Sequence, residues 1–267
     1  MQPYSIALGD VNNDGKLDIV AVNYAADTVS VILNNEVITG SSTFQTKVDY
    51  SAGTTGAQPY SVAIGDVNGD GKPDLAVANV GLNTISVFIN NGNGTYAPKV
   101  DYAAGANPFS VAIGDLNGDG KPDIVVTNYN SNTISVFINN GNGTFAAKVD
   151  YTTGSLPHSV AIGDLNGDGK PDLAVADLTA NTISVFINNG NGTFATKVDY
   201  TTGLLPRSVV IGDVNGDGKP DLAVANQNSN TVSVLMNNGN GTFATKVDYT
   251  VASAPLSVAI GDVNNDG

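Results

Sequence analysis

The sequence is built from one unit that returns about every 49 residues. The motif Gly-Asp-(Val/Leu)-Asn begins at six positions: Gly9, Gly65, Gly114, Gly163, Gly212 and Gly261. The last four intervals are 49 residues, whereas the first is 56, because the stretches 36–44 and 53–59 are longer than their counterparts. Periods of 20 to 50 residues are typical of solenoids, propellers and stacked arrays, so the period restricts the fold to these architectures.

Each unit contains four short segments with the composition of β-strands. In the third unit, residues 110–114, 124–127 and 133–138 are apolar on both faces and rich in β-branched side chains. The fourth segment, 148–151, alternates charged and apolar residues, as expected for an outer strand with one face in water. Clusters of Gly, Asn and Asp separate the segments, and none has helical periodicity.

Four strands per unit, tight turns and this period predict an all-β protein, a β-propeller of four-stranded antiparallel blades. A stacked β-solenoid is the structural alternative, although its repeats are usually shorter. We expect residues 1–267 to form a single repeat domain, a segment of a longer repeat array. The expected units are 3–58, 59–107, 108–156, 157–205 and 206–254, with a partial unit, 255–267, that adds one inner strand.

The turn between the first two strands carries the chemistry of each unit. Counting the strands A to D from the inside, the A–B turn of the second unit runs from Asp66 to Asp74, with side-chain oxygens at positions 1, 3, 5 and 9. Calcium takes six to eight hard oxygen ligands, and Gly71 at position 6 permits the sharp turn around them. By analogy with the EF-hand loop, the backbone carbonyl of Lys72 at position 7 is a further ligand.

The spacing therefore predicts about one Ca²⁺ in each complete unit. Asp, Asn and Gly are also common in ordinary turns, but three convergent carboxylates would repel one another strongly without a cation. Magnesium is less expected, since it prefers fewer protein ligands. The predicted ligands are Asp10, Asn12, Asp14, Lys16, Asp18, Asp66, Asn68, Asp70, Lys72, Asp74, Asp115, Asn117, Asp119, Lys121, Asp123, Asp164, Asn166, Asp168, Lys170, Asp172, Asp213, Asn215, Asp217, Lys219, Asp221 and, in the partial unit, Asp262, Asn264 and Asp266.

The charge and composition of the chain exclude several classes of protein. Of the 25 acidic residues, 15 lie in the five complete loops, and the ten positive charges of five Ca²⁺ ions would bring the formal net charge from −14 to −4. The basic residues form no patch, which argues against a nucleic-acid partner. No apolar stretch approaches the ~20 residues of a membrane span, so we expect a chain that does not cross a membrane. There is no Cys, which excludes disulfides and a cysteine nucleophile.

The segment Ser110–Asp123, repeated at fixed spacing over essentially the whole chain, resembles the FG-GAP or VCBS-type repeats of integrin α-subunit propellers and related surface proteins. This resemblance implies calcium in the A–B turns, ligand capture by the B–C and D–A loops at the opposite face, and an extracellular location. Relatives commonly close with seven blades, whereas this chain has five complete units and a lone A strand at 255–264. The unpaired strand offers an edge for self-association.

Variation among the units is concentrated at one end. The A–B and C–D turns hardly change, but the B–C loops differ, and the residue after the D–A proline is different in nearly every unit: Tyr4, Tyr60, Phe109, His158, Arg207 and Leu256. Binding loops are often arranged in this way on a fixed scaffold, although drift at unconstrained loop tips gives the same pattern. Aromatic residues there could stack on sugars or anchor peptides. His158 and Arg207 are expected to be exposed to solvent.

The sequence predicts a calcium-binding extracellular recognition or adhesion module with a protein or glycan ligand. The alternatives are a structural spacer or surface-array protein and a lectin. We expect no enzyme, no catalytic residue and no organic cofactor. The chain has a single His, and the repeat places its spare carboxylates on the outer strands, at Asp49, Asp101, Asp150, Asp199 and Asp248.

Overall fold

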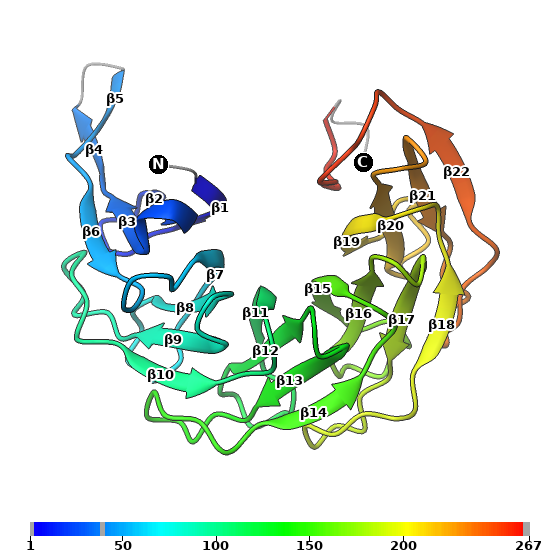
Figure 1. Cartoon of the computed structure of the whole chain (residues 1–267), viewed down its shortest axis with the longest axis horizontal. Helices are drawn as coiled ribbons and strands as arrows, with labels where there is room; N and C mark the ends of the chain where they lie inside the picture. Colours follow the sequence, from blue (N-terminus) through cyan, green and yellow to red (C-terminus); the bar gives the residue numbers. More distant parts are fainter. Residues whose placement is uncertain (1–2, 38–40, 264–267) are drawn as a thin grey trace. The chain divides into compact units, whose positions relative to one another are not determined.

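A computed structural model describes residues 3–37 and 41–263 of the chain (Figure 1). Its strands form five four-stranded antiparallel sheets and one two-stranded hairpin, which confirms the predicted blades. The residues fall into two compact units. The first contains Met1–Ile113, Gly120–Val126 and Ser135–Val149, and the second contains Gly114–Asp119, Thr127–Ile134 and Asp150–Gly267.

The strands follow the repeats closely. The first sheet contains β1 (Pro3–Gly9), β2 (Asp18–Asn23), β3 (Thr28–Ile32) and β6 (Val48–Ser51). The second contains β7 (Pro59–Gly65), β8 (Asp74–Asn79), β9 (Thr84–Phe88) and β10 (Val100–Ala103). The third contains β11 (Pro108–Gly114), β12 (Asp123–Asn128), β13 (Thr133–Phe137) and β14 (Val149–Thr152). The fourth contains β15 (Pro157–Gly163), β16 (Asp172–Asp177), β17 (Thr182–Phe186) and β18 (Val198–Thr201). The fifth contains β19 (Pro206–Gly212), β20 (Asp221–Asn226), β21 (Thr231–Leu235) and β22 (Val247–Thr250).

Two segments depart from the regular repeat. The longer stretch in the first unit forms an extra hairpin of β4 (Asn34–Val37) and β5 (Ser41–Phe44), and a short 3₁₀ turn, η1, covers Tyr24–Ala26. Residues 255–262, predicted as an additional inner strand, have no strand assignment. An inner strand takes its ladder of hydrogen bonds from strand B of its own unit, and the partial unit supplies no strand B.

The hydrophobic cores lie between successive sheets. The B strands are the most buried, and all six residues of β8 and of β16 are buried, as expected for strands covered on both faces. One core joins the first and second sheets, another joins the second and third, and a third joins the fourth and fifth. The tyrosines of the first four outer strands each meet an aromatic ring of the next unit edge-on, as Tyr50 meets Tyr96 at 5.3 Å between ring centroids.

The inner strands of successive units fit together through one isoleucine and one glycine. Ile113 of β11 packs over Gly65 of β7, where a Cβ added to the glycine would lie 2.8 Å from Ile113 Cγ2. Ile211 packs over Gly163 in the same way, at 3.0 Å. The last glycine of the Gly-Asp series, Gly261, has no atom within 4 Å of the equivalent point. Glycine is therefore needed at this position because the blades stack too closely to leave room for a side chain.

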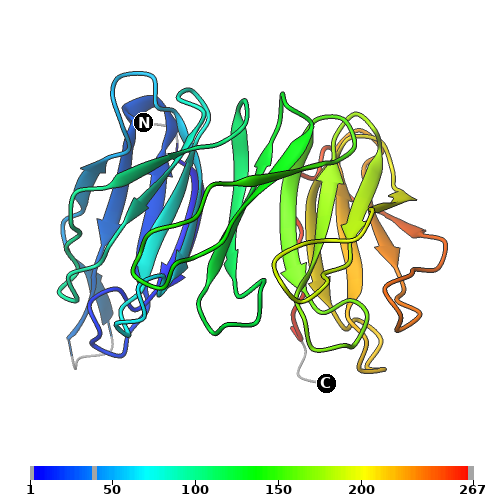
Figure 2. The same ribbon diagram turned by 90° about the horizontal axis from the view of Figure 1, so that it is seen from below.

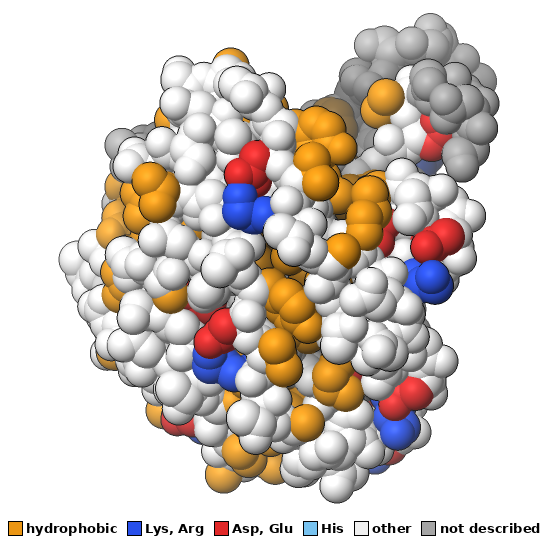
Figure 3. Space-filling view, turned by 90° about the vertical axis from the view of Figure 1, so that its right-hand side faces the viewer, with side chains coloured by type: hydrophobic (Ala, Val, Ile, Leu, Met, Phe, Trp, Pro, Cys, Tyr) orange, Lys and Arg blue, Asp and Glu red, His pale blue; other side chains and the backbone are white. Residues whose placement is uncertain are grey.

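The turns of each sheet lie at two opposite ends (Figure 2). Antiparallel order places the A–B and C–D turns at one end and the B–C and D–A loops at the other. Along the outer strands, lysine and aspartate side chains pair at spacing i, i+2, as in Lys197 with Asp199 and Lys246 with Asp248. Figure 3 shows blue and red side chains next to one another on one face of the molecule. Among the residues that the structure describes, no helix is long and apolar enough to cross a membrane.

Replacement of Gly65 by alanine tests the stacking of the inner strands. Gly65→Ala is expected to lower the free energy of unfolding by about 1–3 kcal/mol, because the added methyl group overlaps Ile113. Gly261→Ala is the matched control and is expected to change stability by less than about 0.5 kcal/mol. Urea unfolding of both variants measures the difference, and equal effects at the two positions would contradict this packing.

Candidate functional site

The A–B loops fold around the carboxylate at position 1. In the second unit, the Asp66 carboxylate accepts hydrogen bonds from the backbone N–H groups of Gly69, Asp70 and Gly71, with donor–acceptor distances of 2.8, 3.1 and 2.7 Å. The Asn68 side-chain oxygen accepts a second bond from the Asp70 N–H at 3.0 Å. Gly71 has a φ of +79°, a conformation that favours glycine and allows the chain to turn back. The predicted ligand positions are therefore brought into one compact turn.

The other complete loops repeat this arrangement. Asp10, Asp164 and Asp213 each accept from the N–H groups at positions 5 and 6 of their own loops. These backbone donors, the Gly218 N–H above all, hold the pKa of Asp213 below its ordinary value. The third loop crosses the boundary between the two compact units, and within residues 115–119 Asp115 accepts from the N–H groups of Gly118 and Asp119. In the partial unit Asn264 and Asp266 lie outside the described residues.

The aspartate at position 9 has a different environment. Asp74 is fully buried as the first residue of β8, and its two oxygens accept from the backbone N–H groups of Val67, at 3.0 Å, and Asn90, at 2.7 Å. Burial raises the pKa of Asp74, and the nearby carboxylates of Asp70 and Asp66 raise it further. Asp172 has the same surroundings and the same upward shift. These shifts show that the acids of one loop lie within electrostatic range of each other.

A buried asparagine then joins each loop to the preceding one. Asn90 donates from its side-chain nitrogen to the carbonyl oxygens of Pro73, in its own unit, and Val11, in the preceding unit, both at 2.8 Å. Its side-chain oxygen accepts from the Gly92 N–H of the C–D turn. The same bridge recurs in both compact units, through Asn139 to Val67, Asn188 to Leu116 and Asn237 to Leu165. The acidic loops are thus fixed to the scaffold and to one another.

The donor set fits a hard divalent cation, but the loop oxygens are directed at backbone amides. Each loop presents three carboxylates, one amide oxygen and a carbonyl at position 7, which are the ligand types that Ca²⁺ prefers. Within residues 3–37 and 41–263, no three Asp, Glu or His side chains are grouped as a metal site. Calcium at these loops stays a prediction.

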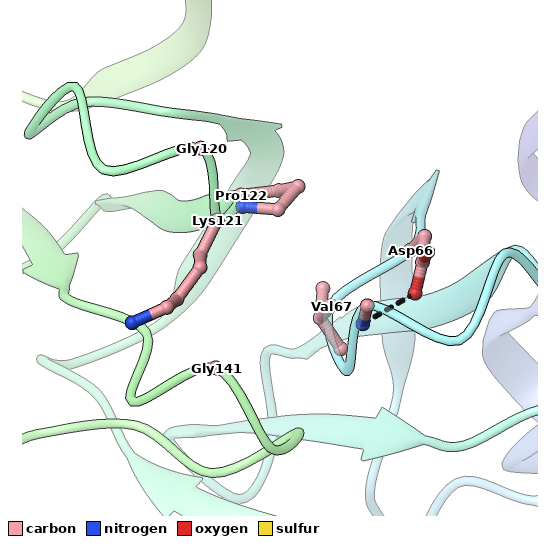
Figure 4. A pocket seen from close by; sticks show the side chains of 7 residues that line it. Asp66, Val67, Gly120, Lys121, Pro122 and Gly141 are labelled. Carbon is pink, nitrogen blue, oxygen red and sulfur yellow. Dashed lines mark hydrogen bonds between the residues drawn. The ribbon is translucent and has the colours of Figure 1, made fainter.

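A small hollow lies beside the loops of consecutive units. In the first compact unit it has a volume of about 190 Å³, with Asp66 and Val67 on one side and Lys121 and Pro122 on the other (Figure 4). The Lys121 side chain points at Gly141, where a Cβ would lie 2.6 Å from Lys121 Cδ. An equivalent hollow of about 180 Å³ is present in the second compact unit. Both are too small for a drug-sized ligand.

The opposite end of the blades is shaped by a bulge in each inner strand. The register of the A strand shifts between the proline and the serine that follows it, at Pro59/Ser61, Pro157/Ser159 and Pro206/Ser208. The bulged residue is the variable one found in the sequence, so the bulge presents side chains that differ among most units.

Hydrogen bonds from the B–C loops hold a strained backbone at the bulges. The residue before the proline has a positive φ even where it is leucine, at +57° for Leu156 and +54° for Leu205. The side-chain oxygens of the B–C loop asparagines Asn132 and Asn181 accept from the N–H groups of Leu156 and Leu205, at 2.8 and 2.9 Å. Each B–C loop therefore fixes the D–A loop of the next unit, and backbone strain of this kind often marks functional sites.

In the first compact unit the bulged residues form a cluster of aromatic rings. The Tyr4 ring lies 4.8 Å from both Tyr24 and Tyr60, and Tyr60 lies 4.3 Å from Phe109, measured between ring centroids. Tyr4 is about half exposed, at 49% of its surface. Exposed rings fixed by their neighbours lose little conformational entropy when a ligand stacks on them.

In the second compact unit the bulged residues are polar and bonded to each other. His158 Nδ1 lies 2.8 Å from the backbone oxygen of Arg207, and Nε2 lies 3.1 Å from the Arg207 guanidinium. Because a carbonyl only accepts and a guanidinium only donates, the ring carries its proton on Nδ1 and is neutral. Burial and the charge of Arg207 lower the pKa of His158 to about 4. The expectation of an exposed histidine is therefore wrong, since the fold places its ring between Arg207 and Tyr129.

A buried acid lies at the same end of the fourth sheet. Asp177 occupies the position held by Asn79 in the second unit, where the Asn79 side chain donates to Ser86 and Ser86 donates to an outer-strand aspartate. In the fourth unit Ser184 faces two carboxylates, Asp177 at 2.7 Å and Asp199 at 2.8 Å, but has one hydroxyl hydrogen. A proton on Asp177 resolves this conflict, and burial raises its pKa to about 6. The fourth unit is the only complete unit with Asp in place of Asn at this position, so the repeat pattern alone does not reveal the titrating group.

The sequence matches the family model of the FG-GAP-like repeat in five overlapping segments, 10–77, 66–126, 115–175, 164–224 and 213–267. These segments cover almost the whole chain. The chain belongs to the FG-GAP-like repeat family. This confirms the resemblance drawn from the segment Ser110–Asp123, and each match begins at the first aspartate of an A–B loop. No curated protein sequence matches the chain.

Solved structures share the fold of this FG-GAP-like protein at low identity. A protein from Lactobacillus plantarum has a TM-score of 0.69 and 18% identity, with 96% of this chain and 73% of that chain covered. A lectin from Agrocybe aegerita, described as recognising non-reducing terminal N-acetylglucosamine, has a TM-score of 0.61 and 23% identity, with 92% and 66% covered. The periplasmic gluconolactonase of Pseudomonas aeruginosa has a TM-score of 0.65 and 18% identity, with 95% and 71% covered. The FG-GAP-like chain thus spans just under two thirds of the lectin.

The gluconolactonase corrects one expectation. The prediction that the chain is not an enzyme is wrong, because this fold also occurs in a protein named for an enzymatic activity. The prediction was argued from residues that recur in every unit, among which no nucleophile lies beside a base. His158, Asp177 and Arg207 each occur in one unit only, so that argument does not cover them. The structure brings His158 and Arg207 into contact.

His158 and Asp177 are expected to give the stability of the FG-GAP-like chain opposite pH dependences. The lowered pKa of His158 makes stability fall as the pH drops from 6.5 to about 4, by about 3 kcal/mol in total. The raised pKa of Asp177 makes stability fall as the pH rises from 3.8 to about 6, also by about 3 kcal/mol. Arg207 and Tyr129 face the histidine, whereas Asp199 and Lys197 lie near Asp177.

Urea unfolding of His158→Gln and Asp177→Asn between pH 4 and pH 7 measures these effects. Relative to the wild-type chain, Asp177→Asn should gain stability with rising pH, because asparagine restores the arrangement of Asn79 and Ser86. His158→Gln should lose stability over the same range. Two parallel profiles would contradict the assigned protonation states.

Proposed function

We propose that this FG-GAP-like chain is a calcium-binding extracellular recognition module. Calcium binds at the A–B loops, and a glycan binds at the end formed by the B–C and D–A loops. The observation that carries this proposal is the contrast between the two ends of each blade. One end repeats the same oxygen-rich loop in every complete unit, and the other presents on the same bulge a residue that differs among most units.

The calcium part of the proposal rests on the chemistry of the loops. Asp66, Asn68, Asp70, the Lys72 carbonyl and Asp74 would hold the ion in the second unit, with the equivalent residues in the other complete loops. Burial is the main cause of the raised pKa of Asp74, and a bound cation would offset the repulsion from Asp70 and Asp66 that adds to it. Its chemical contribution is a fixed positive charge that stiffens the end of the blade.

The ligand part rests on the residues at the opposite end. The aromatic cluster of Tyr4, Tyr24, Tyr60 and Phe109 supplies faces and edges that stack on sugar rings. The loops around it contain Thr54, Thr55, Gln58 and Asn83, whose side chains carry groups that hydrogen-bond to hydroxyls. An extracellular location fits loops with millimolar affinities, since calcium is abundant enough there to fill them.

Metal removal tests the calcium sites. In excess Ca²⁺ the melting temperature is expected to rise well above its value in chelator, since each site held at a hundred times its dissociation constant adds about 2.7 kcal/mol to the free energy of unfolding. Elemental analysis after dialysis against Ca²⁺ should find about five ions per chain. Mg²⁺ is the control ion and should stabilise much less. An equal melting temperature in Ca²⁺ and in chelator would contradict the proposal.

A further inference from the structure

The only arginine of the chain lies against its only histidine. Among 11 basic residues, ten are lysines that recur at repeated positions, and Arg207 is the exception. Arg207 and His158 occupy the same bulged position in successive units. The repeat therefore places one fixed guanidinium group at the ligand end of the second compact unit.

The partners of Arg207 are neutral. Its Nε donates to the Gln227 side-chain oxygen, and one terminal nitrogen donates to Nε2 of the neutral His158 ring. Lys197, by contrast, pairs with Asp199 on an outer strand. In the described part of the chain, no carboxylate lies within ion-pair distance of Arg207. The positive charge of this guanidinium is thus not offset by an ion pair, in a protein with a formal net charge of −14.

The free donors of Arg207 suit one carboxylate group. A guanidinium has five N–H donors, and two are used by Gln227 and His158. Both terminal nitrogens retain N–H groups, which is what bidentate binding of a carboxylate requires. Gln227 and His158 also hold the planar group in one orientation, so binding costs little further side-chain entropy.

The loops around Arg207 carry no charged side chain and combine polar residues with leucines. Four D–A and B–C loops of the second compact unit read Thr-Gly-Ser-Leu at 153–156, Leu-Thr-Ala-Asn at 178–181, Thr-Gly-Leu-Leu at 202–205 and Gln-Asn-Ser-Asn at 227–230. Hydroxyl and amide groups suit a ligand made mainly of hydroxyls. One cation among them suits a single negative charge, whereas a polyanion would need several. These groups together match a sugar acid better than an acidic peptide.

We propose that Arg207, oriented by His158 and Gln227, binds the carboxylate of a sugar acid at the ligand end of the second compact unit. This inference rests on the proposed function, because it names the class of glycan recognised there. The sugar acid is either free or part of an oligosaccharide, and the Arg207 guanidinium supplies the charge-assisted bonds in both cases.

Binding of galacturonic acid and its oligomers, in Ca²⁺, tests the proposal. The matched probes are the same oligomers as methyl esters, which keep every hydroxyl group and lose the charge. The wild-type chain should bind the free acids and bind the esters at least about tenfold more weakly. Arg207→Gln should weaken binding of the acids by about 10- to 100-fold, and Arg207→Lys by an intermediate factor. The monomer distinguishes a free sugar acid from one within a chain.

Lys197→Gln is the control, because it removes the same charge from an outer strand. Its affinity for the acids should equal that of the wild-type chain, and circular dichroism should show that all variants are folded. Equal binding of acids and esters, unaffected by Arg207→Gln, would overturn the inference and leave the proposed glycan binding intact. Arg207-dependent binding of an oligoglutamate peptide in place of the sugars would also overturn it. Absence of binding to every sugar by the folded chain would contradict the proposed function itself.

Discussion

The buried aspartate that ends each A–B loop is the interaction on which the rest of the structure depends. Asp74 is fully buried, yet its two oxygens bind the first turn of its own loop at Val67 and the start of the C–D turn at Asn90. Asn90 in turn binds the loop of the preceding unit at Val11. Burying a carboxylate is unfavourable unless its charge is met by hydrogen bonds, and here backbone amides meet it. The acidic loop is consequently part of the scaffold even without a metal.

This arrangement lets the two ends of a blade serve different purposes. At the A–B end, the carboxylates at positions 1 and 5 accept hydrogen bonds from backbone N–H groups of the loop, as Asp66 and Asp70 do, while position 9 fixes the loop in place. At the other end, the bulge presents side chains that differ among most units, next to the strained leucines Leu156 and Leu205. Close packing between consecutive repeats, such as Ile113 on Gly65, keeps the same two ends aligned from one repeat to the next.

The repeat period was sufficient to predict the strands, the sheets and the acidic loops, because each depends on local pattern. Four features could not be predicted from the repeat period. The dual role of Asp74 depends on Asn90, whose amide meets it only in the folded sheet. The pairing of His158 with Arg207 joins residues 49 positions apart, and the protonation of Asp177 follows from one shared hydroxyl hydrogen. The segment 255–262 had the sequence of a strand but no strand B to pair with.

The most direct measurement of the central claim is the stability of Asp74→Asn and Asp70→Asn in excess chelator. Asp74→Asn should lower the free energy of unfolding by about 2 kcal/mol, because an amide nitrogen would face backbone N–H donors in a buried site. Asp70→Asn, at an exposed position of the same loop, should stay within about 0.5 kcal/mol of the wild-type chain. Equal stability of the two variants in chelator would contradict a scaffold role for the buried aspartate.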